Sequence, residues 1–323
     1  MSKNKSTNNA YTANVKVRDF YGTRKVFFTI SIILIAVSIL SSFIFGVGIA
    51  IEFKGGTIAD YSYSGTVDEN ELANIAKEVV DTNVNVQLGE TFTGDNQASF
   101  TVSFSKEDPF TVELQQEMVD KFMEKYPDSN IECLQCNDVA PTAGKTFFGK
   151  CIVAAIFAAI VLILYIAWRF KKISGWSAGL FAVVTLLHDL VTVYGSFVIC
   201  GFEIDSNFMA VILTILGYSV NDTIVIYDRI RENQQLMPKT TSLPELVNTS
   251  LSQTMKRTIR TSITTITTML IVTILAAVKG VDSILSFSIP LMVGMICGCY
   301  SSLCLAPMLW TTWKLRGKNT AKD

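Results

Sequence analysis

The sequence predicts an all-α membrane bundle of six transmembrane helices that carries one α+β domain outside the membrane. Only 17% of the 323 residues are charged, whereas about a quarter is usual in a soluble domain. The charges gather in residues 1–25, in residues 52–150 and in short connectors. Between them lie apolar stretches of 20 or more residues, long enough to cross a hydrocarbon core of ~30 Å at ~1.5 Å per residue.

Six stretches meet this length criterion. In chain order they are Val26–Ala50, Phe147–Trp168, Trp176–Cys200, Ser206–Tyr227, Ile259–Val278 and Ile284–Trp313. The first exceeds the ~7–15 residues of a signal-peptide core, and no small-residue cleavage pattern closes it, so we expect an uncleaved anchor. The last is longer than one span requires, and we expect it to tilt or to kink at Pro290.

The lysines and arginines in short loops indicate the orientation, because these residues favour the cytoplasmic side. Six lie in residues 1–25, three in the connector Arg169–Lys172, six between Arg229 and Arg260, and four in the C-terminal tail. The turn after Cys200 has none. We therefore expect a cytoplasmic tail at 1–25, a first span at 26–50, an extracytoplasmic domain at 51–142, five further spans within 143–316 and a cytoplasmic tail at 317–323. This organisation describes a multi-pass protein of the cytoplasmic membrane.

The segment between the first two spans has the pattern of a small α+β domain. Alternation and β-favouring residues predict strands, and helical spacing of apolar residues predicts helices. The expected elements are Thr57–Tyr63, a helix at Asp68–Asp81, Val84–Leu88, a hairpin turn at Thr93–Asn96, Ala98–Phe104, a helix at Phe110–Tyr126, and Ile131–Val139. The order βαββαβ is that of the ferredoxin-like motif. The domain has no histidine and no acidic pair at a catalytic spacing, so binding is favoured over catalysis.

Seven cysteines are present, and five of them lie in or beside apolar spans. Cys133 and Cys136 form a single CxxC in the outer domain, which by itself is weak support for zinc or redox chemistry. Free thiols and a local disulfide both fit the sequence, and we expect neither a metal nor a cofactor.

Three stretches carry a family resemblance. The first is Gly48-Ile-Ala-Ile-Glu-Phe-Lys-Gly-Gly-Thr57, and the second is the pair His188-Asp189 in the third span. The third is Ile215-Leu-Gly-Tyr-Ser-Val-Asn-Asp-Thr-Ile-Val-Ile-Tyr-Asp-Arg-Ile-Arg-Glu-Asn233, followed by Ser252-Gln-Thr-Met-Lys-Arg-Thr258. Together they resemble the SecD/SecF family of protein-export membrane proteins, and most closely its SecF members. Glu52 stands where that family usually has aspartate.

The resemblance covers residues ~20–315 and implies a function and partners. Members of this kind belong to the resistance-nodulation-division superfamily and assist protein export beside SecD and the SecYEG channel, driven by a proton or sodium gradient. Exported preproteins would be the cargo. The family motifs fall here on Glu52, Gly55, Gly56, Thr57, Tyr218, Asn221, Asp228 and Arg229.

Ionisable residues inside the spans are candidates for ion coupling, because such residues are costly in a bilayer and usually mark ion pathways. They are Asp222, Asp189 and His188, with Arg257 at the mouth of the fifth span. A proton carrier needs a carboxylate whose protonation a partner can shift. Asp222 as carrier and Arg257 as its moving partner fit this requirement, and the resemblance points to the same positions.

Structural explanations stay open for each of these residues. Asp222 and Arg257 could form a static pair that holds helices together, and Asp189 and His188 could be plain hydrogen-bonding groups. Asp228 and Arg229 suit interfacial anchoring or a gating network. Pro290, Gly294, Gly298 and Ser302 recur every four residues in the last span, a spacing for close helix packing within the chain or against a partner.

The sequence also excludes some functions. A net charge of −1 argues against nucleic-acid binding. Gly144-Lys145-Thr146 lacks the earlier glycine of a P-loop, since Val139 occupies that position, so we expect no nucleotide site. The alternatives to an export subunit are an exporter of small molecules or lipids from the same superfamily and a scaffold that transduces no gradient. Proton and sodium are not distinguished.

Overall fold

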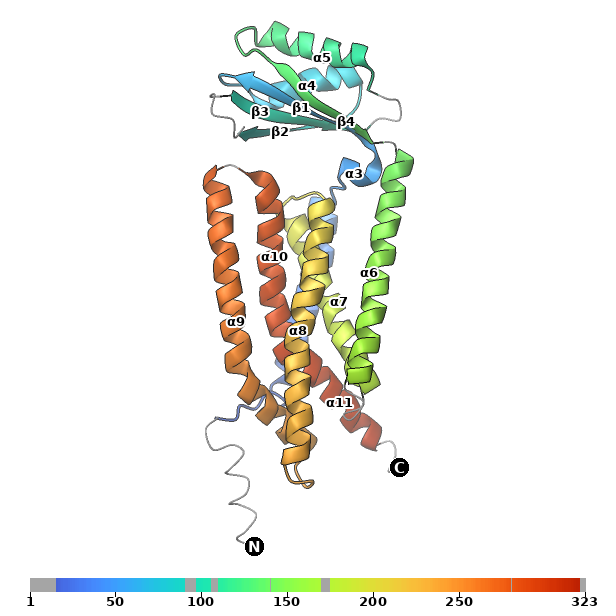
Figure 1. Ribbon diagram of the computed structural model, residues 1–323, viewed down its shortest axis with the longest axis vertical. Helices are drawn as coiled ribbons and strands as arrows, with labels where there is room; N and C mark the ends of the chain where they lie inside the picture. Colours follow the sequence, from blue (N-terminus) through green and yellow to red (C-terminus); the bar gives the residue numbers. More distant parts are fainter. Residues whose placement is uncertain are drawn as a thin grey trace.

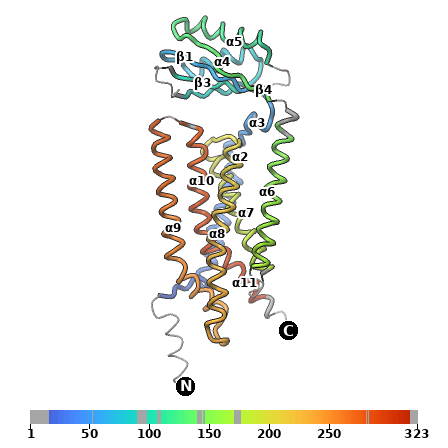
Figure 2. The backbone as a smooth tube through the Cα atoms, viewed as in Figure 1, coloured from blue at the N-terminus to red at the C-terminus, as the bar shows by residue number. Residues whose placement is uncertain are grey.

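The structure, a computed structural model, describes residues 16–90, 97–105, 110–139, 141–169, 175–279 and 281–319. A small α+β domain lies above one end of a bundle of long helices (Figure 1). The described chain begins and ends at the opposite end of the bundle, as the tube in Figure 2 shows. We call that end the terminal end and the other the domain end.

Within the described residues, six helical segments are long and apolar enough to cross a membrane, as the sequence predicts. The bundle helices are α2 (Arg24–Phe45), α6 (Pro141–Arg169), α7 (Gly175–Ile199), α8 (Ser206–Leu236), α9 (Leu243–Lys279), α10 (Asp282–Tyr300), the π-helical turn η2 (Ser301–Leu305) and α11 (Ala306–Asn319). With 31 and 37 residues, α8 and α9 exceed the ~20 residues of a span. They extend past the predicted span limits at Tyr227 and Ile259 towards the terminal end.

The small domain follows the predicted order of elements. These are β1 (Gly56–Ser64), α4 (Glu69–Val80), β2 (Val84–Glu90), β3 (Gln97–Phe104), α5 (Val112–Lys125) and β4 (Glu132–Val139). The antiparallel sheet has the order β2-β3-β1-β4. Side chains of Asp68 and Thr111 cap α4 and α5 by accepting backbone N–H groups. The hairpin turn predicted at Thr93–Asn96 lies outside the described residues.

One face of the sheet forms the core of this domain. Alternate residues of the strands point towards α4 and α5, which lie on the side away from the bundle (Figure 1). The aromatic rings of Tyr61 and Phe100 stack at 5.1 Å, and Phe122 of α5 meets both edge-on. The other face of the sheet is turned to the domain end of the bundle, so the domain presents a polar strand surface to the membrane helices.

The first membrane helix is shorter than predicted. α2 ends at Phe45 rather than Ala50, because Gly46 takes a positive φ of 74°, a conformation that glycine adopts without strain. The chain then pairs with the turn after α7. The Ala50 N–H donates to the Ile204 carbonyl (3.1 Å), and the Ile204 N–H donates to the Gly48 carbonyl (2.8 Å). A short parallel bridge therefore replaces the last helical turn.

The last span also departs from expectation. α10 continues through Pro290, and the irregular segment is η2. A π-helical turn shifts the register of the side chains that follow it. The small-residue stripe packs inside the molecule: a Cβ at Gly294 would meet Ile215 at 2.7 Å, and one at Gly298 would meet Ser219 at 3.3 Å. Of the two explanations left open by the sequence, packing within the chain accounts for these glycines.

Candidate functional site

Asp189 is the centre of a buried polar cluster in the bundle. Its side chain is fully buried. One carboxylate oxygen, Oδ2, accepts hydrogen bonds from the hydroxyls of Ser219 and Ser301, both at 2.7 Å. The other, Oδ1, lies 3.1 Å from His188 Nδ1 and accepts from the Cys297 thiol at 3.4 Å. Asp189 thus connects α7, α8, α10 and η2.

Two members of this cluster, Cys297 and Ser301, could not be recognised from the sequence. They lie more than 100 residues from Asp189, and only the packing of the last span brings them near it. His188 reaches Asp189 although the two point about 100° apart on α7, which the helical spacing alone did not predict. One ligand atom each of His188, Asp189 and Cys297 lies within 4.8 Å of the others. A metal ion could bridge them, but the hydrogen bonds already satisfy the carboxylate.

Asp222 lies on α8 and is nearly as buried as Asp189, with 5% of its surface exposed. Its surroundings differ. Asp222 Oδ2 has no hydrogen-bond partner in the described part of the chain. One turn closer to the domain, the Tyr218 hydroxyl donates to Ser262 Oγ of α9 at 3.0 Å. Among the described residues, Asp222 is therefore a buried carboxylate of the bundle with one oxygen that accepts no hydrogen bond.

Arg257 of α9 is exposed, and its positive charge acts on the Asp222 carboxyl group. Within the described residues the two form no ion pair within 4.0 Å. Arg257, Thr261, Thr264 and Thr268 follow one another at helical spacing and form an exposed polar seam along α9. In the isolated chain this seam is not covered by the other helices.

The charges at the terminal end of α8 form ion pairs. Asp228 pairs with Arg231 at 2.6 Å and with Arg169 of α6 at 3.3 Å. Arg229 pairs with Glu232 at 2.6 Å, and its Nε donates to Gln253 Oε1 of α9 at 2.6 Å. Arg229 follows Asp222 by two helical turns, and its side chain contacts Gln253 of α9 rather than Asp222. Asn221 is exposed on α8.

The glycine motif after α2 forms the junction between bundle and domain. It comprises the short helix α3 (Ile51–Lys54) and the start of β1. Phe53 lies 5.7 Å and 5.3 Å, between ring centroids, from two phenylalanines at the start of α6, Phe147 and Phe148. Gly55 and Gly56 have φ of 85° and 141°, so both positions favour glycine.

Two side chains fasten the strand that leaves this junction. The Thr57 hydroxyl donates to Asp138 Oδ1 of β4 at 3.0 Å, and the Ser105 hydroxyl donates to the Gly55 carbonyl at 3.0 Å. The side chain of Glu52 lies outside the described part of the structure. The described residues of the motif thus position the domain.

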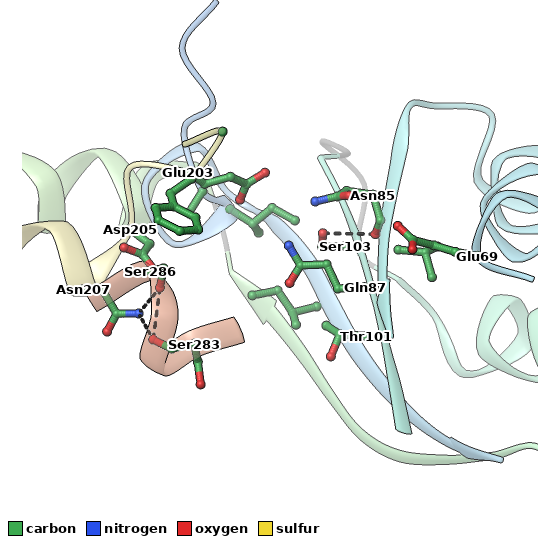
Figure 3. A pocket seen from close by; sticks show the side chains of 16 residues that line it. Glu69, Asn85, Gln87, Thr101, Ser103, Glu203, Asp205, Asn207, Ser283 and Ser286 are labelled. Atoms are coloured by element: carbon green, nitrogen blue, oxygen red, sulfur yellow. Dashed lines mark hydrogen bonds between the residues drawn. The ribbon is translucent and has the colours of Figure 1, made fainter. Parts of the chain in front are cut away.

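A crevice of about 440 Å³ separates the polar sheet face from the domain end of the helices. Its sheet side presents the side chains of Asn85, Gln87, Thr101 and Ser103, and three carboxylates, Glu69, Glu203 and Asp205, also line the crevice (Figure 3). On its bundle side, the Asn207 amide donates to the Ser283 carbonyl and to Ser286 Oγ at 3.2 and 3.0 Å. Such a surface can exchange hydrogen bonds with backbone amides of another chain.

Cys133 and Cys136 lie on the edge strand β4 as free thiols. They pair in register with Tyr61 and Ala59 of β1, because an irregularity between Asp60 and Tyr61 adds one residue to β4. Since Tyr61 and Ala59 both face the core, both cysteines lie over the core side of the sheet. Burial raises the pKa of each thiol, which disfavours reactive thiolates.

Comparisons with known proteins identify close relatives. A family model described as "Protein export membrane protein SecD/SecF, C-terminal" matches residues 118–316. "Protein translocase subunit SecF" of Petrotoga mobilis is 33% identical over 308 residues, which are 94% of this chain and 98% of that protein. "Protein translocase subunit SecDF" of Bacillus subtilis is 33% identical over 312 residues, which are 94% of this chain and 39% of that protein.

Solved structures agree with these relatives. The crystal structure of SecDF from Thermus, described as a translocon-associated membrane protein, superimposes with a TM-score of 0.75 at 27% identity and covers 93% of this chain. SecDF in its super-membrane-facing form gives a TM-score of 0.68 at 28% identity and covers 95% of this chain. The match covers 39% and 40% of those SecDF chains, so this chain corresponds to about two fifths of their length.

Proposed function

The chain belongs to the SecD/SecF family of protein-export membrane proteins, and from this premise we propose that it couples a transmembrane proton or sodium gradient to protein translocation as a SecF subunit. The observation that carries the proposal is Asp222. It is a carboxylate within a membrane helix, 5% exposed, with one oxygen free of hydrogen bonds among the described residues. A group of this kind can gain and lose a cation as the helices around it move.

The two buried carboxylates have different roles in this proposal. Asp189 is held by two serines, a histidine and a cysteine, so protonation would break established hydrogen bonds. Asp222 Oδ2 accepts no hydrogen bond in the described structure, so its protonation would break none. Asp222 is therefore the carrier, with Arg257 as the charge that approaches or withdraws, and Asp189 with His188 is the fixed anchor of α7, α8 and η2.

The exposed polar seam of α9 is an argument for a partner chain that covers it. Arg257, Thr261, Thr264 and Thr268 lie on the surface of α9, and Asn221 lies on that of α8. Polar side chains at membrane depth need cover from protein or water. Relatives named SecDF contain this chain's counterpart within a protein more than twice as long. A SecD chain is therefore the partner that we expect to cover the polar seam. The SecYEG channel and exported preproteins complete the machinery.

The proposed topology follows the charges. The terminal end carries the ion pairs of Asp228 and Arg229 and the basic tails, so we place it in the cytoplasm. The α+β domain then lies outside the cytoplasmic membrane. Its element order and sheet order fit a ferredoxin-like fold. The polar crevice under its sheet suits the gripping of an extended chain through backbone hydrogen bonds.

The decisive experiment compares export into inverted vesicles with and without a gradient. Asp222→Asn should remove gradient-dependent stimulation while the protein still inserts and accumulates. Asp120→Asn, which changes an exposed carboxylate of α5 in the α+β domain, is the matched control and should retain stimulation. Wild-type stimulation by Asp222→Asn would exclude the carrier role. A scaffold would show no gradient dependence in any variant, and an exporter of small molecules would act without a SecD chain.

A further inference from the structure

Among the buried polar side-chain atoms that lack a hydrogen-bond partner in the described structure are Asp222 Oδ2 on α8 and Thr258 Oγ1 on α9. Thr258 is 1% exposed. Its hydroxyl differs from those of other threonines of α9. Thr254, Thr261 and Thr265 each donate to the carbonyl four residues earlier, the usual solution for a hydroxyl in a helix. Thr258 Oγ1 does not use its own backbone.

The hydrogen bonds on either side fix the register of the two helices. Tyr218 of α8 bonds to Ser262 of α9, and Arg229 bonds to Gln253 nearer the terminal end. The two helices run in opposite directions (Figure 1). Asp222 follows Tyr218 by one helical turn, and Thr258 precedes Ser262 by one turn. The two unpartnered atoms are therefore at the same level of the α8–α9 interface.

A buried hydroxyl or carboxylate oxygen without a partner costs about 1–3 kcal/mol, and a water molecule removes that cost where it finds two to four polar partners. From this geometry we propose that Thr258 Oγ1 and Asp222 Oδ2 hold one water molecule between α8 and α9, and that the proton of Asp222 enters and leaves through it. Thr258 is then a positioning residue of the coupling site. The inference rests on the proposed carrier role of Asp222.

The transfer through this water molecule conserves the number of protons. When a proton reaches the water oxygen, another proton of the same water moves to Asp222 Oδ2, and a neutral water remains hydrogen-bonded to Thr258. Unloading reverses both movements. The titratable or charged groups around Asp222 are Tyr218 on its own helix, Arg257 on α9 and Cys299 on α10. The positive charge of Arg257, which acts on Asp222, disfavours a bound sodium ion at these oxygens, so the site suits a proton carried by water.

The test uses the full-length protein with its SecD partner, and its variants are Thr258→Val, Thr258→Ser and Thr254→Val. Thr258→Val keeps the shape and removes the hydroxyl, whereas Thr258→Ser keeps the hydroxyl. Thr254→Val is the matched control, because Thr254 is buried on the same helix and donates only to backbone carbonyls. We expect Thr258→Val to lower gradient-driven export about five-fold, the factor for a hydrogen bond of ~1 kcal/mol, and the other two to stay near wild type.

Infrared difference spectroscopy on acidification gives a second readout. The C=O band of protonated Asp222, identified by its loss in Asp222→Asn, should move to higher frequency in Thr258→Val, because a water bridge is lost. It should stay in place in Thr258→Ser. An unchanged band and unchanged export in Thr258→Val would overturn the water bridge while leaving Asp222 as carrier. Wild-type export by Asp222→Asn would instead overturn the proposed function itself.

Discussion

Replacing Asp189 by alanine should destabilise the helical bundle strongly, since this carboxylate is the acceptor that connects α7 with α8, α10 and η2. The change would leave the hydroxyls of Ser219 and Ser301 without their common acceptor. It would also remove the partner of His188 Nδ1 and of the Cys297 thiol. Four interactions are lost at one fully buried position.

The expected magnitude follows from those four interactions. Hydrogen bonds between membrane helices contribute about 0.6 kcal/mol on average and up to about 1.7 kcal/mol. Three of the four interactions join different helices, those of Ser219, Ser301 and Cys297, and together they give about 2–5 kcal/mol. Asp189→Asn keeps one acceptor oxygen and should lose less than half as much. Thr264→Ala is the control, because Thr264 is exposed and its hydroxyl donates only to its own helix.

Reversible unfolding in mixed micelles can measure these losses. The fluorescence of Trp310, which is 1% exposed in the native bundle, reports unfolding as the denaturing detergent increases. A double-mutant cycle with Ser301→Ala should give a coupling free energy of about 1 kcal/mol with Asp189→Ala. If Asp189→Ala unfolds at the wild-type midpoint, the cluster does not hold the bundle together, and Asp189 would need another role.

Three further predictions concern the domain and the topology. Gly56→Ala should destabilise the domain by about 1–3 kcal/mol in pulse proteolysis, because its Cβ would collide with the Phe104 carbonyl, whereas Gly65→Ala meets no atom within 4 Å and should cost less. The Tyr126 hydroxyl donates a hydrogen bond to the Glu71 carboxylate and lowers the pKa of Glu71. This hydrogen bond stabilises the domain at neutral pH, and the stabilisation is lost as pH falls through the folded-state pKa, which lies below the usual ~4.3. Tyr126→Phe should therefore reduce the loss of domain stability in acid. A cysteine at residue 240 should resist labelling from outside intact cells, and external labelling there would refute the topology.

The sequence determined the elements of this protein and their type. Membrane spans need long apolar runs, and a small α+β core needs alternating and helical apolar spacing, so each left a local pattern. The bounds of the domain elements differ from the expected ones by at most two residues. Asp222 was also visible locally as a candidate, because a carboxylate within an apolar run stands out in the sequence without any knowledge of its partners.

The tertiary structure alone decided how the polar residues are partnered. Cys297 and Ser301 meet Asp189 only through packing of the last span, and no pattern within either segment predicts it. Thr258 looks like any other threonine of α9 in the sequence, yet its hydroxyl lies unpartnered at the level of Asp222. Element type follows from neighbours along the chain, whereas hydrogen-bond partners depend on helix register, which many weak contacts across the bundle fix together.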